Sequence, residues 1–429
     1  MKKALSLILM FALIMSCCVF SGVSASAAEE DFTYKALTAT TAEITGYTGS
    51  GGNVTLPSSW GDLQIVGIAS KAFYQNKNLK EVTIPEGITY IGEKAFAGSF
   101  ITGVKMSESV TTLGNSAFGS CVFLIDVTIS KNIKTLSNNC FSNCNLLPKV
   151  TIPEGVEVID TGAFESCRHL TDVTFPSTLK FIGEYAFAYA QFTTLELPEG
   201  LETIDDSAFF MCPNLKSVNI PSTVRTIGDW AFCFCPSLSA VSFLASAQLE
   251  SIGANAFDSS PLELTLIPDS VKYIGEHALG YYYDDFTGSY HHYPDFQILC
   301  TKDSAGHEYA QGNIFPYAIY TVEPEPTTTA TEPSSTATEP TATETVPTST
   351  ATEPVDTSTA TEPQKPEYDM GDVNLDGNVN IKDATAIQKH IASILTLSAE
   401  ALEVADFNGD GSLNIKDATA IQKFIAGII

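Results

Sequence analysis

The residues Leu170-Thr-Asp-Val-Thr-Phe-Pro176, then Leu179-Lys-Phe-Ile-Gly183 and Ala186-Phe187, make up one unit of a repeat that runs through most of this chain. The first stretch alternates apolar and other residues as a half-buried β-strand does, and the proline and glycine that follow are turn residues. The phenylalanine of the unit recurs every 22 or 23 residues, with one spacing of 25, at Phe73, Phe96, Phe118, Phe141, Phe164, Phe187, Phe209, Phe232 and Phe257, and Leu279 takes its place in the last unit.

A unit of this length cannot bury its own apolar face, so neighbouring units must stack on one another and form a solenoid. At a strand spacing of about 4.8 Å, roughly ten coils make a rod on the order of 50 Å long. The pattern resembles the treponemal, or BspA-like, class of leucine-rich repeat of bacterial surface proteins, over about residues 31–320. This resemblance implies an N-terminal capping hairpin within 34–52, and a closing strand, short helix and strand between Phe296 and Phe315.

The first 28 residues have the pattern of a secretory signal peptide. Lys2 and Lys3 precede an apolar run over 4–20, and Ala25-Ser-Ala27 is a small-residue cleavage signal. Because no second apolar run of spanning length follows, we expect an exported protein that does not span the membrane. A lipoprotein-like stretch that ends at Cys17 leaves lipidation open. The 429 residues carry a net charge of −28 with only 22 Lys and Arg, which argues against nucleic acid as a partner.

Residues 323–367 consist mainly of Thr, Ala, Glu, Pro and Ser, with Thr-Ala-Thr-Glu-Pro repeated. Such a composition cannot bury a core, so we predict a disordered linker that spans about 40 Å as a coil. Its threonines and prolines leave O-glycosylation open. The linker separates a solenoid domain at 29–322 from a C-terminal module at 368–429.

Two loops of this module, 34 residues apart, carry oxygen ligands at the spacing of a twelve-position calcium loop. Side-chain oxygens stand at positions one, three and five, glycine makes the sharp turn at six, and a backbone carbonyl is the ligand at seven. Aspartate takes position twelve in place of the usual glutamate. We therefore predict two Ca²⁺ ions, held by Asp372, Asn374, Asp376, Asn378 and Asp383 in the first loop and by Asp406, Asn408, Asp410, Ser412 and Asp417 in the second.

No helical pattern precedes either loop, so each half is expected to be a loop followed by a helix, unlike an ordinary EF-hand sensor. This arrangement closely resembles the type I dockerin family over 370–429. The resemblance implies calcium-dependent attachment to a cohesin module on the scaffoldin of a cellulosome. The predicted fold class is α+β and multi-domain: a β-rich leucine-rich-repeat solenoid plus a small all-α dockerin of two loop-helix units.

The segment Asn380–Lys389 recurs letter for letter as Asn414–Lys423. Core packing would demand identity only at apolar positions, so identity elsewhere indicates a shared binding surface; recent duplication without functional symmetry is the alternative. The dockerin resemblance implies two equivalent sets of cohesin contacts, Ile381, Lys382, Gln388, Lys389 and Ser393, and Ile415, Lys416, Gln422, Lys423 and Gly427. We hypothesise that either helix docks, in two orientations related by a half-turn.

Tyr281–Tyr293 interrupts the last repeat and is the candidate ligand loop of the solenoid. Exposed aromatic side chains stack on sugar rings or fill a partner's pocket, whereas an insertion packed on the terminal coil is the alternative. The residues concerned are Tyr281, Tyr282, Tyr283, Tyr290, His291, His292 and Tyr293. The residues between Val and Ile of each strand suit either a solvated face or a polar ligand; they are Thr83, Lys105, Thr128, Thr151, Thr174, Glu196, Asn219 and Ser242.

Five cysteines each follow the repeat phenylalanine by three residues: Cys121, Cys144, Cys167, Cys212 and Cys235. We predict an inward ladder of small apolar side chains, with disulfides as the alternative.

The sequence contains neither Gly-x-Ser-x-Gly nor His-Glu-x-x-His, and its close acidic pairs, Asp205-Asp206 and Asp284-Asp285, lie on coil connections. We therefore predict that the solenoid binds a protein or a polysaccharide without catalysis. The dockerin would deliver it to an extracellular, cellulosome-associated complex in polysaccharide degradation. The alternatives are a hydrolase that acts on polysaccharide or protein, and an inhibitor or regulator of secreted enzymes.

Overall fold

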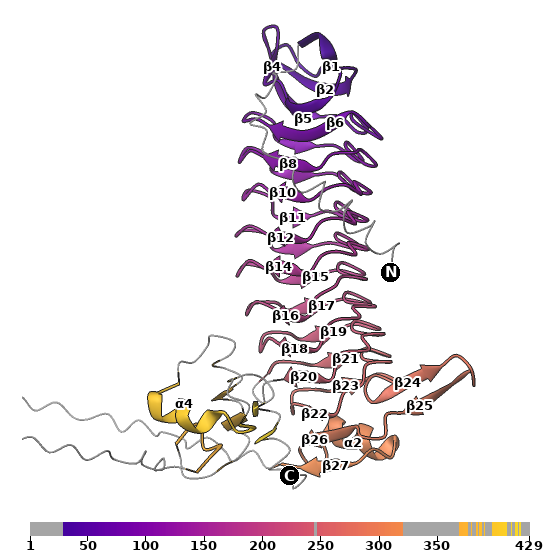
Figure 1. Cartoon of the computed structure of the whole chain (residues 1–429), viewed down its shortest axis with the longest axis vertical. Coiled ribbons are helices and arrows are strands. Elements are labelled where there is room, and N and C mark those ends of the chain that lie inside the picture. Colours follow the sequence, from indigo (N-terminus) through magenta and orange to yellow (C-terminus); the bar gives the residue numbers. More distant parts are fainter. Residues whose placement is uncertain are drawn as a thin grey trace, which may run out of the picture.

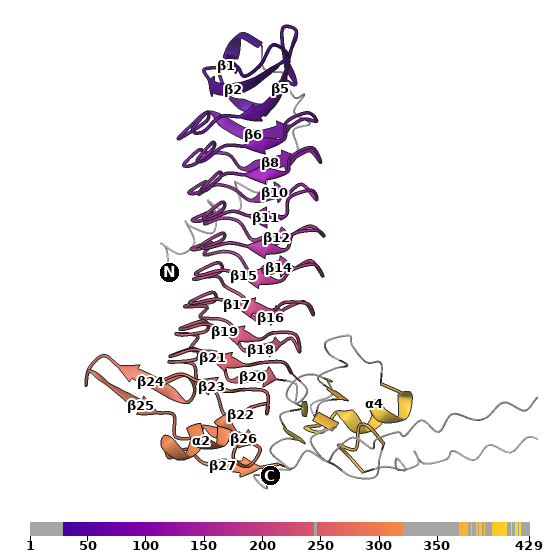
Figure 2. The same ribbon diagram turned by 180° about the vertical axis from the view of Figure 1, so that it is seen from behind.

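The computed structural model describes residues 29–243, 247–320, 369–375, 379, 383–384, 386–387, 390, 397–409, 413, 417–418 and 420–421. Its main body is a β-solenoid of about 12 turns, which confirms the predicted architecture (Figure 1; Figure 2). The predicted signal peptide and linker lie outside the described residues. In the described part of the chain, no helix has the length and apolar character needed to cross a membrane.

Each coil contributes one longer strand from its Leu-x-x-Val-x-Ile stretch, as predicted, and these strands stack in parallel. Apolar positions of each strand point to the core because side chains alternate along a strand. The stack is interrupted between β10 and β12, between β14 and β16, and between β20 and β22. The strands are β3 (Gly52–Thr55), β6 (Leu79–Ile84), β8 (Gly103–Met106), β10 (Asp126–Thr128), β12 (Lys149–Thr151), β14 (Asp172–Thr174), β16 (Thr194–Glu196), β18 (Ser217–Ile220), β20 (Ala240–Phe243), β22 (Leu264–Leu266), β26 (Gln297–Cys300) and β27 (Tyr317–Ile319).

A second parallel ladder forms at the Ile-Gly position of the repeat, where half of its ten strands carry Ile-Gly itself. A Cβ at Gly183 would lie 2.8 Å from the backbone nitrogen of Thr161 in the preceding coil, so a larger residue here would force these two backbones apart. The strands are β5 (Leu63–Ile68), β7 (Tyr90–Ile91), β9 (Thr112–Leu113), β11 (Thr135–Leu136), β13 (Val158–Ile159), β15 (Phe181–Ile182), β17 (Thr203–Ile204), β19 (Thr226–Ile227), β21 (Ser251–Ile252) and β23 (Tyr273–Ile274).

The repeat phenylalanines form a continuous stack through the centre of the solenoid. From Phe73 to Phe257 each ring lies nearly parallel to the next, and the spacing of ring centroids between Phe164 and Phe187 is 5.3 Å. All of these side chains are buried. Because each coil meets only its two neighbours, this stack carries apolar contact from each coil to the next.

The cysteine ladder is inward and reduced, as predicted. All eight cysteines within 29–320 are buried and free. Each ladder thiol lies close to the carbonyl oxygen of the phenylalanine one coil back, as Cys121 Sγ does to Phe96 O at 3.2 Å. Burial raises the pKa of the Cys121 thiol to about 12, so the thiol stays protonated and can donate this weak hydrogen bond.

Both predicted caps are present. At the N-terminus, η1 (Glu29–Asp31) leads into β1 (Phe32–Ala36), which pairs antiparallel with β2 (Thr41–Tyr47), and β4 (Ser59–Trp60) pairs with β5. At the other end α2 (Ala305–Gly312) lies between β26 and β27, and its N-cap Ser304 accepts a hydrogen bond from the backbone of His307. β2, β26 and β27 continue the parallel stack, which explains why the solenoid exceeds the ten repeats of the sequence.

Candidate functional site

Each coil passes through the left-handed backbone region near its phenylalanine. In five successive coils the position two residues after the phenylalanine is small or polar: Gln75, Gly98, Ser120, Asn143 and Ser166. Bulky side chains are rare there because Cβ then approaches the backbone too closely. The next three coils nevertheless place Tyr189 (φ 68°), Met211 (φ 54°) and Phe234 (φ 55°) at this position. Three large side chains thus occupy an unfavourable conformation along one edge of the solenoid.

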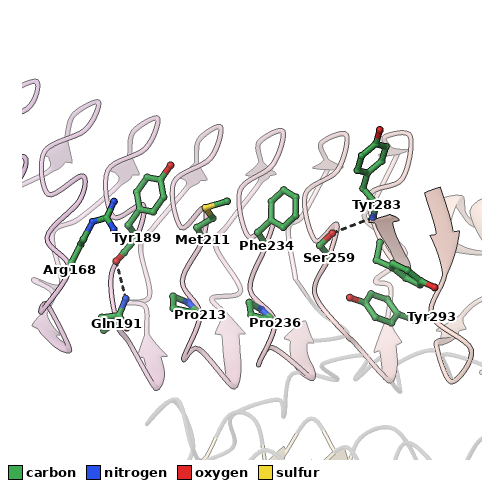
Figure 3. Close-up of a pocket in the computed structure, with 11 residues that line it drawn as sticks. Arg168, Tyr189, Gln191, Met211, Pro213, Phe234, Pro236, Ser259, Tyr283 and Tyr293 are labelled. Carbon is green, nitrogen blue, oxygen red and sulfur yellow. Dashed lines mark hydrogen bonds between the residues drawn. The ribbon is translucent and has the colours of Figure 1, made fainter. Parts of the chain in front are cut away.

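These three side chains line a groove of about 550 Å³ in the C-terminal half of the solenoid (Figure 3). Met211 and Phe234 each expose 37% of their surface. None of these three residues was predicted to form a site, although the change from small to large at one repeat position is visible in the sequence. The groove is lined by Arg168, Tyr189, Gln191, Met211, Pro213, Phe234, Pro236, Ser259, Tyr282, Tyr283 and Tyr293.

Three residues of the predicted ligand loop complete the groove. The loop is a β-hairpin of β24 (Tyr281–Asp284) and β25 (Ser289–His292) that projects from the solenoid (Figure 1). The backbone nitrogen of Tyr283 donates to Ser259 Oγ at 3.3 Å, which ties the hairpin to the adjacent coil. The rings of Tyr282 and Tyr293 lie 5.0 Å apart. Tyr282, Tyr283 and Tyr293 therefore extend the row of apolar side chains begun by Tyr189.

The other four loop residues do not line this groove. Tyr281 is buried, and its hydroxyl donates to Asn313 Oδ1 at 2.6 Å. The ring of His292 packs against Tyr281 and Phe315, whereas His291 Nε2 lies 3.0 Å from Thr287 Oγ1. Tyr290 stacks on His277, with ring centroids 3.8 Å apart. The two histidines thus have separate surroundings, and the hairpin packs partly on the terminal coil and partly along the groove.

Polar groups stand at the ends of the groove. The guanidinium carbon of Arg168 lies 5.3 Å from the centroid of the Tyr189 ring, a cation–π arrangement. At the other end, burial and, to a smaller extent, the negative charge of Asp258 together raise the pKa of Tyr293 to about 12. The Tyr293 hydroxyl therefore stays protonated at neutral pH and can donate a hydrogen bond. The groove therefore offers aromatic surface together with a charged hydrogen-bond donor, Arg168, and a neutral one, the Tyr293 hydroxyl.

The acidic pairs noted in the sequence act as acceptors for backbone turns. Asp206 Oδ1 accepts a hydrogen bond from the backbone of Asp229 at 2.8 Å, and Asp229 Oδ1 accepts from Ala254 at 2.7 Å. Asp284 accepts from the backbone of Phe286 and from the Thr287 hydroxyl, and these hydrogen bonds lower the pKa of its carboxyl. Burial raises the pKa of Asp205. Asp206 and Asp284 therefore serve as hydrogen-bond acceptors for nearby backbone.

The polar row on the sheet face is largely exposed in the middle coils and becomes buried at Ser242. A second hollow, of about 500 Å³, lies where the stack of strands is interrupted between β14 and β16. Thr174 and Glu196 of the row line it.

The described residues of the C-terminal module fit a calcium site. The backbone of Asn374 donates to Asp383 Oδ1 at 2.9 Å, so positions three and twelve of the first loop are in contact. The second loop repeats this contact between Asn408 and Asp417 at 3.2 Å. Asp383 and Asp417 are fully buried, and buried carboxylates of this kind are ligands that Ca²⁺ prefers. The predicted ligands Asp376, Asn378, Asp410 and Ser412 lie outside the described residues.

One expectation for this module is wrong. A helix, α4 (Ala399–Ala405), ends directly before the second loop, where no helix was predicted. Its N-cap Ser398 accepts a hydrogen bond from the backbone of Ala401, and Ala, Glu and Leu fill the helix. The described residues after each loop are helical, as expected. Both sets of predicted cohesin contacts lie outside the described residues.

Comparison with protein families agrees with the two parts of the chain. A model of the BspA type leucine rich repeat region, in six copies, matches residues 66–191 and 158–283, about half of the chain together. A model of the dockerin type I domain matches residues 370–426. No curated protein matches the chain.

Solved structures of leucine-rich repeat proteins are similar to the solenoid at low identity. One from Bacteroides ovatus is 18% identical over 70% of this chain and 100% of its own, with a TM-score of 0.38. A leucine rich cell surface protein from Faecalibacterium prausnitzii is 22% identical over 71% and 97%, with a TM-score of 0.39. The T. pallidum leucine rich repeat protein is 26% identical over 59% and 99%, with a TM-score of 0.35.

Proposed function

The chain belongs to the BspA-type leucine-rich-repeat family and ends in a type I dockerin domain, and from this premise we propose that it is a secreted, non-catalytic adaptor. Its dockerin binds a cohesin on an extracellular scaffold, and its solenoid binds a polysaccharide in the groove between Tyr189 and Tyr293. The observation that carries the proposal is the pairing of a dockerin with a row of large apolar side chains held in strained turns.

Two Ca²⁺ ions hold the dockerin in this proposal. The contact between positions three and twelve of both loops supports it, because these positions must converge on one ion. The ligands would be Asp372, Asn374, Asp376, Asn378 and Asp383, and Asp406, Asn408, Asp410, Ser412 and Asp417. The cohesin contacts would be the two repeated sets that begin at Ile381 and Ile415.

Either set is sufficient for binding if both docking orientations are used. Replacing Ile381 and Lys382 by alanine, or Ile415 and Lys416, is expected to change the cohesin Kd by less than about threefold. Replacing all four should weaken binding at least about a hundredfold, because no apolar anchor is left on either surface. Calorimetry with a panel of type I cohesins in calcium measures the effect, and Glu403→Ala serves as a control on the same module. A half variant as weak as the fourfold variant would contradict the dual mode.

A polysaccharide fits the groove better than other ligand classes. Aromatic faces present a flat apolar surface to the faces of sugar rings, and Arg168, Gln191 and the tyrosine hydroxyls offer hydrogen bonds to sugar hydroxyls. The three turn positions follow one another coil by coil, so they offer successive contacts to an extended chain. The acidity of the protein makes a strongly acidic polymer an unsuitable ligand.

Removing two of the aromatic side chains is expected to weaken this binding without loss of stability. In Tyr189→Asn/Phe234→Asn, asparagine takes the place that Asn143 has in an earlier coil, so the turns are kept. Loss of two aromatic contacts should weaken binding by roughly 5- to 100-fold. Affinity electrophoresis and calorimetry of the full-length protein with soluble xylan and mixed-linkage glucan measure the change.

Phe123→Ala is the matched control, because Phe123 exposes a similar fraction, 41%, on a coil outside the groove. If the asparagine variant binds every polysaccharide as the unaltered protein does, the groove is not the site. If the unaltered protein binds a secreted protein but no polysaccharide, the proposed ligand class is wrong. A role as a regulator of secreted enzymes is then the better interpretation.

A further inference from the structure

The outward face of the sheet changes character at the end of the solenoid. Along the row from Thr83 to Ser242 the residues that point away from the core are polar or charged. The next member of the row is Leu266, and Leu264 is the outward residue two positions before it. Leucine at two successive outward positions makes an apolar surface that a solvated sheet face does not need.

The terminal strands enlarge this apolar surface. Leu266 of β22 is in register with Leu299 of β26, which is in register with Ala318 of β27. Ile298, the neighbour of Leu299, points the other way and belongs to the core of the solenoid. Side chains alternate along a strand, so Leu299 faces outward with Leu266. We call Leu264, Leu266, Leu299, Ala318 and Tyr320 the terminal patch.

The terminal patch is covered in the structure. Leu264, Leu266, Leu299 and Tyr320 expose between 1% and 5% of their surface. They do not belong to the core cluster of the solenoid but to a second cluster. The other members of that cluster come from the dockerin, Val373, Ile387 and Ile421 among them. Both views place α4 of the dockerin beside the end of the solenoid that carries β22 and β26 (Figure 1; Figure 2).

We propose that the terminal patch is an intramolecular docking surface for the dockerin of the same chain. The segment between them, residues 321–368, has the composition of a coil about 40 Å in span, so its two ends can lie close together. Docking removes apolar surface of both parts from water, which is the driving force for the contact. The protein then presents its dockerin at a defined place beside the C-terminal cap. This inference does not depend on the ligand of the groove or on cohesin binding.

Small-angle X-ray scattering of the full-length mature protein in calcium tests the proposal. Leu266→Glu places in the patch the residue that Glu196 supplies at the same row position, so the solenoid should keep its fold. We expect a clear increase in the radius of gyration and in the longest dimension, because the dockerin leaves the patch. Thr151→Glu makes the same change at an exposed position of the row and should leave both values unaltered.

A second variant keeps the test decisive. Leu266→Thr introduces the residue that stands at the same row position in Thr128, Thr151 and Thr174. It is used in place of Leu266→Glu if Leu266→Glu melts at a lower temperature than the unaltered protein. Circular dichroism in calcium verifies that the dockerin of each variant is folded. If the unaltered protein already scatters as an extended molecule, indistinguishable from a folded Leu266 variant, the docking proposal is wrong.

Discussion

Chelation of calcium from the full-length protein is expected to unfold the dockerin and to abolish cohesin binding, while the solenoid stays folded. The ligands of each loop converge only in the folded module, so the free energy of binding the ion is also free energy of folding. Loss of affinity should exceed about a thousandfold, because the cohesin surface is carried by the helices that the loops position.

The carboxylates at the loop ends give the physical reason. Asp383 and Asp417 are fully buried, and each accepts a backbone hydrogen bond from position three of its loop. Without a cation, several carboxylates would stand together in a site shielded from water, which is costly. The solenoid is held instead by stacked apolar side chains, which do not depend on an ion.

Circular dichroism and calorimetry with a cohesin, in calcium and in excess chelator, measure the two effects. Asp383→Asn should weaken calcium binding to the first loop only. The control is Asp285→Asn, which makes the same change of charge on an exposed turn of the solenoid hairpin. An unchanged helical signal in excess chelator would show that the ions do not hold the module together.

Phe164→Ala is expected to destabilise the solenoid by about 3–5 kcal/mol, the usual loss when a buried phenylalanine is truncated. Phe164 is fully buried and stacks on Phe141 at 5.4 Å and on Phe187 at 5.3 Å. A cavity at this place removes the apolar contact to both neighbouring coils at once. In a molecule whose coils touch only their neighbours, the change should also uncouple the two halves.

Urea unfolding followed by circular dichroism measures this loss as a lower midpoint and a broader transition. Phe123→Ala is the matched control, because Phe123 is 41% exposed and its removal leaves no cavity in the core; we expect a change within about 0.5–1 kcal/mol. Equal effects of the two substitutions would mean that the central stack is not what holds the coils together.

Much of the solenoid was predictable because its geometry is local and repeated. The phenylalanine spacing indicates the coil length, Ile-Gly marks where neighbouring backbones meet, and the proline after each strand marks the turn. The caps were predicted from the resemblance to the repeat family, whose pattern includes them at both ends. In the dockerin, the positions of the calcium loop are likewise local. The helix before the second loop was missed because seven residues are too few to show an apolar periodicity, although Ser398 and the Ala-Glu-Ala run were signals for it.

The sequence by itself therefore determined the repeating coil and the order of the coils, because each coil depends on residues close together in the chain. Only the tertiary structure decided which side chains meet across coils. Tyr189 and Tyr283 stand far apart in the sequence and line one groove, because coils stack and the hairpin is tied back to Ser259. Leu264 and Leu266 look like core leucines in the sequence. The register of β22 with β26 places Thr265 beside the core residue Ile298, so Leu264 and Leu266 face outward. A shift of one residue would exchange the two faces of the strand.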